Sequence, residues 1–86
     1  MKLLRTPMLY EYSNNHPEIV NSIKAWIFKV SKAKWKNESD VLESLPKTQF
    51  IHANEALFEI APNQHYLSAL INYSAKAVVV KKVAHG

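Results

Sequence analysis

The hydrophobic positions of the chain change their period near its middle. Up to about residue 45 they recur every three or four residues, which is the period of a helix lying on a core. The clearest stripe consists of Ile19, Ile23, Trp26 and Val30. From residue 49 onward, apolar and polar side chains alternate in short runs, which is the period of strands. The first half therefore predicts helices and the second half a sheet.

The helical half divides at its turn signals. Residues 2–4 form a possible first strand, and Thr6 before Pro7 predicts a helix that begins at residue 7 and ends near residue 14. The His16-Pro17-Glu18 segment starts a second helix in the same way. Ser39 is expected to cap a short helical turn that ends before Pro46.

The second half predicts four strands separated by turns. The expected strands are residues 49–52, 56–60, 66–73 and 77–83. Together with the helices they predict an α+β domain, in which two N-terminal helices pack on one face of a twisted antiparallel sheet. Trp26 and Phe58 are expected in the core, whereas Phe28 lies off the helical stripe and is available for a second contact.

Length and composition limit the choice of protein class. The chain has 86 residues, so residues 1–86 are expected to form a single small domain with a thin core. It has no cysteine, which excludes disulfides and thiolate metal sites. No run of apolar residues is long enough for a membrane span or a signal peptide. We therefore expect a cytoplasmic protein without membrane contact.

The charge favours anionic partners. The chain has eleven Lys and Arg and seven Asp and Glu, which gives a net charge of +4. Lys32, Lys34 and Lys36 alternate with other residues around Trp35, a pattern that can hold phosphates and stack a base. The alternative is that Trp35 fills the core while the lysines are solvated, and we favour this alternative for Trp35 because a thin core needs its large aromatic side chains.

The four histidines show no local metal motif. No pair has a metal-ligand spacing such as H-x-x-x-H, and we expect no metal and no other cofactor. His16 is interpreted as a helix-boundary residue. His65 is expected to open a strand and is interpreted as a solvated turn residue. His52 and His85 each end a strand, where a concave sheet face could gather them. A structural role is favoured for His52, and for His85 a structural and a catalytic role stay open.

The last strand carries Lys81 and Lys82 in sequence. Because side chains alternate along a strand, one of the two is expected on the open face of the sheet. A lysine there can neutralise a scissile phosphate, or it can be an ordinary edge charge that discourages aggregation. Tyr66 and Tyr73 can stack on bases or simply fill strands.

An ordered set of segments resembles the HigB-type toxins of the RelE-like superfamily. The set begins with YSNNHPE at residues 12–18 and continues with VSKAKWK at residues 30–36, which is similar to the family's V-S-K-A-x-W-K. It ends with Ile71-Asn72-Tyr73, which matches the family's I-N-Y. The resemblance covers about residues 4–83.

The resemblance implies an activity and partners. Such toxins cleave mRNA on the translating ribosome without metal, and a cognate antitoxin, expected here to be of the helix-turn-helix type, silences them. It implies catalytic roles for His85 and Lys81, with His52 as the next candidate. The residues expected to contact RNA are Lys32, Lys34, Lys36, Tyr66 and Lys82.

Two departures from the family pattern imply weakened catalysis. Tyr66 stands where the family usually has an arginine. The family's ending T-H-x-E-Y-D is matched by His85 alone, one position early, so its Glu, Tyr and Asp have no counterpart. The alternative to a cleaving toxin is therefore a remnant that only binds antitoxin, ribosome or RNA, and a plain RNA-binding module is a third possibility.

Overall fold

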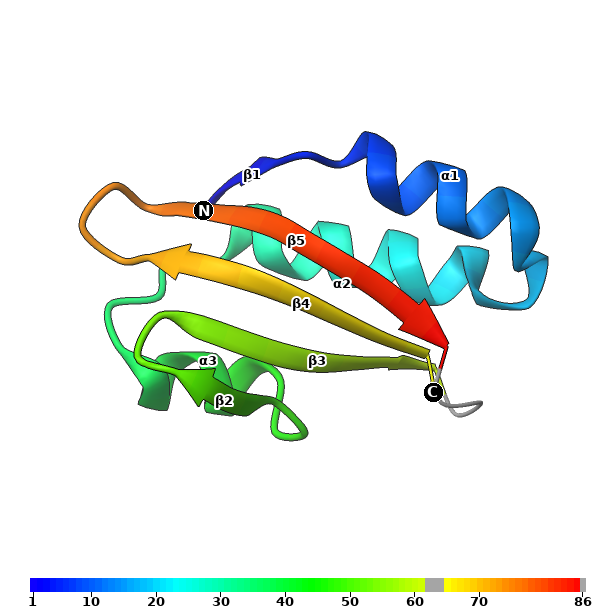
Figure 1. Cartoon of the computed structure of the whole chain (residues 1–86). Coiled ribbons are helices and arrows are strands. Elements are labelled where there is room, and N and C mark those ends of the chain that lie inside the picture. Colours follow the sequence, from blue (N-terminus) through cyan, green and yellow to red (C-terminus); the bar gives the residue numbers. More distant parts are fainter. Residues whose placement is uncertain (62–64, 86) are drawn as a thin grey trace.

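Figure 1 shows a sheet whose strands run side by side, with α1 and α2 on the same side of it. The structure is a computed structural model and describes residues 1–61 and 65–85. Its elements in chain order are β1 (Lys2–Leu4), α1 (Pro7–Asn15), η1 (Pro17–Ile19), α2 (Val20–Lys32), α3 (Glu38–Ser44), β2 (Gln49–His52), β3 (Glu55–Ala61), β4 (His65–Asn72) and β5 (Ala77–His85). The fold is the expected α+β class, and the predicted elements are present with small shifts at their ends.

The sheet has the order β1-β5-β4-β3-β2. The four later strands pair with one another in chain order, and each pair is antiparallel as expected, so they form a meander. β1 adds to the outer edge of β5 in parallel, with Leu3 opposite Val78, so the sheet is mixed rather than wholly antiparallel. The first and the last strand of the chain are therefore neighbours.

The core lies between the helices and one face of the sheet. The predicted stripe of α2 is buried, and Trp26 packs its indole edge-on against Phe58 of β3, with ring centroids 5.3 Å apart. Both predicted core aromatics are confirmed, at 4% and 2% exposure. Trp35 is also buried and donates from Nε1 to Ser44 Oγ at 3.2 Å, so its interpretation as a core residue is confirmed. Phe28 is 62% exposed, as its place off the stripe predicts.

The short helix α3 begins earlier than expected, because a different residue caps it. The Oδ1 atom of Asn37 accepts a hydrogen bond from the backbone N–H of Asp40 at 3.0 Å. The Asp40 carboxylate in turn accepts from the backbone N–H of Lys36 at 2.8 Å. The first bond satisfies a free backbone donor in the first turn of the helix, and the second satisfies the donor of the residue before the cap. Ser39, the predicted cap, lies inside the helix.

β5 contains an irregularity that changes the direction of its lysines. Val80 pairs with Ala69 and Lys82 with Ser68, so Lys81 is the extra residue of a bulge. Ser68 lies on the sheet face away from the helices, because its neighbours Leu67 and Ala69 are core residues. Lys82 therefore lies on the open face. Lys81 reaches the same face, since its Nζ contacts Glu55 Oε1 at 3.0 Å. The bulge places both lysines on the face where alternation predicts one.

Candidate functional site at the end of the sheet

Three segments that are distant in sequence meet at one end of the sheet. The C-terminal turn of α1 and the following η1 carry Tyr12, His16 and Glu18. The first residue of β4 is His65, and it pairs directly with His85, the last residue of β5. We call these five side chains the histidine cluster.

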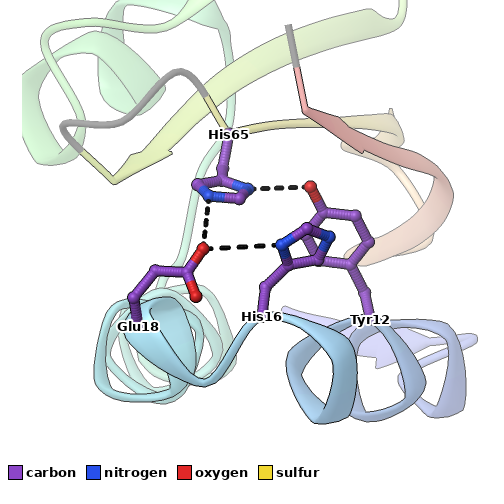
Figure 2. Close-up of polar contacts among 4 residues, drawn as sticks. All are labelled: Tyr12, His16, Glu18 and His65. Carbon is purple, nitrogen blue, oxygen red and sulfur yellow. Dashed lines mark hydrogen bonds and ion pairs between the residues drawn. The ribbon is translucent and has the colours of Figure 1, made fainter.

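His65 is the centre of this cluster, and Figure 2 shows it between Tyr12 and Glu18. Its Nδ1 lies 2.7 Å from the Tyr12 hydroxyl, and its Nε2 lies 3.1 Å from Glu18 Oε2. A neutral His65 with its proton on Nε2 donates to the carboxylate and accepts from the phenol, so both ring nitrogens are satisfied. This matters because the side chain is only 1% exposed, and an unpaired polar atom at such a place is costly.

His16 lies on the solvent side of the same group. Its Nδ1 lies 3.4 Å from the oxygen of Glu18 that also contacts His65. Its ring stacks on that of Tyr12, with centroids 4.4 Å apart and 28° between the planes. One carboxylate oxygen is thus shared between two imidazoles (Figure 2).

His85 completes the cluster at the end of β5. Its ring centroid lies 4.5 Å from that of His65 and 6.0 Å from that of His16. It is exposed, whereas His65 is buried. The arrangement therefore offers an accessible imidazole beside an anchored one, which suits proton transfer to a bound molecule.

The surroundings shift two pKa values in the cluster. The pKa of the Glu18 carboxyl is lowered, chiefly by a hydrogen bond to its own backbone and then by His16 and His65, against an opposing effect of desolvation. The pKa of the Tyr12 phenol is raised by desolvation and by the charge of Glu18. At neutral pH, the cluster therefore contains an ionised carboxylate and a protonated phenol.

The interpretation of His65 as a solvated turn residue is wrong. The residue begins a strand on the helix side of the sheet, where Tyr12 and Glu18 cover it. Sequence reasoning also left Tyr12, His16 and Glu18 without a role in a site, because no short spacing joins them to His65. The available signal was the pairing of two consecutive strands, which brings the start of β4 next to the end of β5.

The expectation that His52 and His85 gather on one face is also wrong. In a meander the first and fourth strands run in opposite directions, so β2 and β5 end at opposite ends of the sheet. His52 pairs with Glu55, and Glu55 pairs with Leu70. Leu70 is five residues from His65, roughly 17 Å along the strand. Because His52 pairs with Glu55 and Glu55 contacts Lys81, His52 lies nearer to Lys81 than to the histidine cluster.

The basic loop after α2 lies far from the cluster too. Lys32, Lys34, Lys36 and Lys76 line a hollow of about 600 Å³, which we call the basic groove. The ammonium group of Met1 contributes to its wall and donates to the Ala33 carbonyl at 2.6 Å. Lys76 precedes the start of β5 and His85 ends it, so groove and cluster lie roughly 26 Å apart along the strand.

A comparison with protein families gives a match to one of them. The family model describes the RelE-like toxic component of a toxin-antitoxin system, and it matches residues 20–85. The chain belongs to the HigB toxin family. A comparison with curated proteins finds no match.

Membership of the HigB family gives the cluster a context. His65 and His85 fall inside the matched region, whereas Tyr12, His16 and Glu18 precede it. A family of toxins from toxin-antitoxin systems implies an antitoxin as partner. In the part of the chain that the structure describes, no helix has the length and apolar character needed to cross a membrane.

Tyr66 lies on the open face of the sheet in this HigB protein. Tyr66 there pairs with Glu59 of β3 and Ala84 of β5. A phenol beside a carboxylate supplies no positive charge at neutral pH. The cations of this face in the described residues of β4 and β5 are Lys81, which contacts Glu55, and Lys82.

Proposed function

We propose that this HigB family member is a toxin that cleaves mRNA on the ribosome in the cytoplasm, without a metal ion, and that an antitoxin of the helix-turn-helix type neutralises it. The observation that supports cleavage is the exposed ring of His85 beside the anchored His65, on the strand that also carries Lys81 and Lys82. The family match supports the toxin role and the antitoxin partner.

The proposed chemistry needs one proton carrier and a few cations. The 2′-hydroxyl of a nucleotide attacks the adjacent phosphorus and gives up its proton, the bond to the 5′-oxygen breaks, the leaving oxygen takes up a proton, and a 2′,3′-cyclic phosphate remains. His85 acts as general acid or base, a role worth roughly 10²–10⁴-fold in rate. Lys82 lies three residues before His85, about 10 Å along the strand. Lys81 and Lys82 lie on the open face of the sheet, whereas His85 lies on the helix side, so in this proposal the two lysines hold neighbouring phosphates of an RNA strand that passes round the end of β5.

The second candidate function is a protein that binds antitoxin, ribosome or RNA without cutting. Two points support it: the resemblance predicts an arginine where this chain has Tyr66, and Glu55 already engages the ammonium group of Lys81. Both reduce the positive charge available to a transition state. Cleavage, where it occurs, is therefore expected to be slow.

Mapping of mRNA 5′ ends after induction separates the two functions. New ends that decline by about 10²-fold or more in His85→Ala support the cleaving toxin. Cutting that is lost in His52→Ala but kept in His85→Ala would move the site to the open face. Ribosome association with no new ends supports the binding protein.

The antitoxin proposal has its own test. The gene product encoded beside this chain is expected to co-purify with it and to raise its melting temperature, because a partner that binds only the folded state stabilises it. A co-expression experiment that recovers no complex contradicts this part of the proposal.

A further inference from the structure

Three side chains of the histidine cluster present metal-ligating atoms to one another. One nitrogen of His16, one carboxylate oxygen of Glu18 and one nitrogen of His65 all lie within 4.8 Å of one another. They come from the α1–η1 junction, η1 and β4, so no short sequence motif contains them. Figure 2 shows the imidazoles of His16 and His65 both directed at one oxygen of Glu18.

The two distances from the carboxylate oxygen fit a tetrahedral ion, and the two histidine nitrogens lie within 4.8 Å of each other. Bonds of about 2.0–2.1 Å to nitrogen and oxygen place neighbouring ligand atoms of a tetrahedron roughly 3.3–3.4 Å apart. The observed separations from Glu18 Oε2 are 3.1 Å to His65 Nε2 and 3.4 Å to His16 Nδ1. We propose that His16, Glu18 and His65 bind a divalent transition-metal ion, with Zn²⁺ as the best fit to two imidazoles and one carboxylate.

Tyr12 supplies the outer support that such a site needs. Metal-bound histidines usually donate their other ring N–H to a nearby acceptor, which fixes the ring. His65 Nδ1 already lies 2.7 Å from the Tyr12 hydroxyl. A metal on Nε2 moves the ring proton to Nδ1, and the phenol oxygen then accepts where it donated before, since it can do both. At His65, binding of the ion therefore requires only that the ring proton shifts to Nδ1 and that the Tyr12 hydroxyl hydrogen rotates away.

The site is partly assembled before an ion arrives. His65 is 1% exposed and is held by Tyr12, while His16 and Glu18 are accessible at 31% and 46%. An ion therefore has a fixed ligand and an open side from which to enter. The fourth position faces solvent or His85, whose ring lies 4.5 Å from that of His65.

This proposal goes beyond the proposed cleavage, which uses no metal, and its test requires no RNA. After treatment with a chelator and its removal, the purified chain is titrated with Zn²⁺ and with Mg²⁺ while its melting temperature is recorded. Zn²⁺ at about 100 times its dissociation constant is expected to raise the melting temperature by roughly 10 °C or more. Mg²⁺ is expected to have no effect, because it prefers oxygen ligands.

Variants assign the ligands. His16→Ala and Glu18→Gln change accessible residues, so the fold is expected to persist, and each should weaken Zn²⁺ binding by tenfold or more. Tyr12→Phe keeps the ring and removes only the hydroxyl, and should weaken it about 10-fold. His52→Ala is the matched control, since it removes a histidine of the described region outside the cluster. His85→Ala tests the fourth position: a loss assigns it to His85, and unchanged binding assigns it to water.

Cobalt gives a second readout that does not depend on stability. Co²⁺ in a tetrahedral site absorbs strongly in the visible range, and this absorption should appear with the native chain and vanish in Glu18→Gln. The proposal is overturned if Zn²⁺ fails to shift the melting temperature. It is also overturned if His52→Ala weakens binding as much as His16→Ala, because binding would then be non-specific.

Discussion

Trp26 joins the helical layer to the sheet. Its indole is 4% exposed and lies edge-on to Phe58 at 5.3 Å. Its Nε1–H has no hydrogen-bond partner among the described residues. The residue therefore stabilises the fold through contact area and ring packing rather than through its polar atom.

Two substitutions at residue 26 separate these contributions. Trp26→Ala should reduce the free energy of unfolding by about 3–5 kcal/mol, because it leaves a large cavity in a thin core. Trp26→Phe keeps a ring against Phe58 and loses no hydrogen bond, so it should cost only about 1–2 kcal/mol. Urea denaturation of both variants measures the difference. Equal losses would show that the indole N–H has a partner after all.

Comparing Trp26 and Phe58 with His65 shows which side-chain surroundings the sequence can predict and which it cannot. The burial of Trp26 and Phe58 follows from spacing alone, because a stripe or an alternation places them directly. The surroundings of His65 depend on Tyr12 and Glu18, which lie some fifty residues earlier in the chain. No local pattern carries that information, so the sequence alone predicts a solvated residue at this position.

At the scale of elements, α3 depends on its first turn. The helix has only one buried residue, Val41, so packing holds it weakly. The bonds between Asn37 and Asp40, and between Asp40 and Lys36, satisfy backbone donors at its start. These bonds also fix the direction in which the basic loop enters the helix.

The cap can be tested against the residue that the sequence favoured. Asn37→Ala should reduce the free energy of unfolding by about 1 kcal/mol, because it removes an N-cap acceptor. Ser39→Ala should change it by no more than about 0.5 kcal/mol, since Ser39 is exposed and inside the helix. Thermal denaturation of the two variants measures both losses of stability. A larger loss in Ser39→Ala than in Asn37→Ala would show that Ser39 is the cap.

The strands were the most predictable elements, and β5 shows why prediction stops short. Alternation located β2 and placed β3 and β4 within one residue at each end. The bulge at Lys81 is invisible in this alternation, because it depends on how β5 pairs with β4. The directions of Lys81 and Lys82 therefore required the register, as did the separation of His52 from His85.

At the scale of the whole molecule, the basic groove and the histidine cluster lie at opposite ends of the sheet. The basic groove lies beside the turn before β5, and the histidine cluster lies where β5 ends. An RNA strand that contacts both must run along the sheet. Lys81 and Lys82 lie between these ends on the open face.

The groove makes a prediction about salt. Lys34→Ala and Lys36→Ala should each reduce the slope of log affinity against log salt concentration by about 0.7 for a single strand, if each lysine contacts one phosphate. Lys24→Ala removes an exposed lysine of α2 that does not line the groove, and should leave the slope unchanged. Filter binding of a short RNA at several salt concentrations measures this. Equal slopes in all variants would exclude the groove from RNA binding.

The parallel pairing of β1 with β5 has a consequence for biosynthesis. Leu3 is synthesised long before its partner Val78, which lies far from it in the sequence. A growing polypeptide therefore carries an unpaired β1 until β5 has left the exit tunnel, and contacts of such high sequence separation form slowly. His85 reaches His65 only at the same late moment. The nascent chain thus cannot assemble the histidine cluster before His85 has been added and has left the exit tunnel.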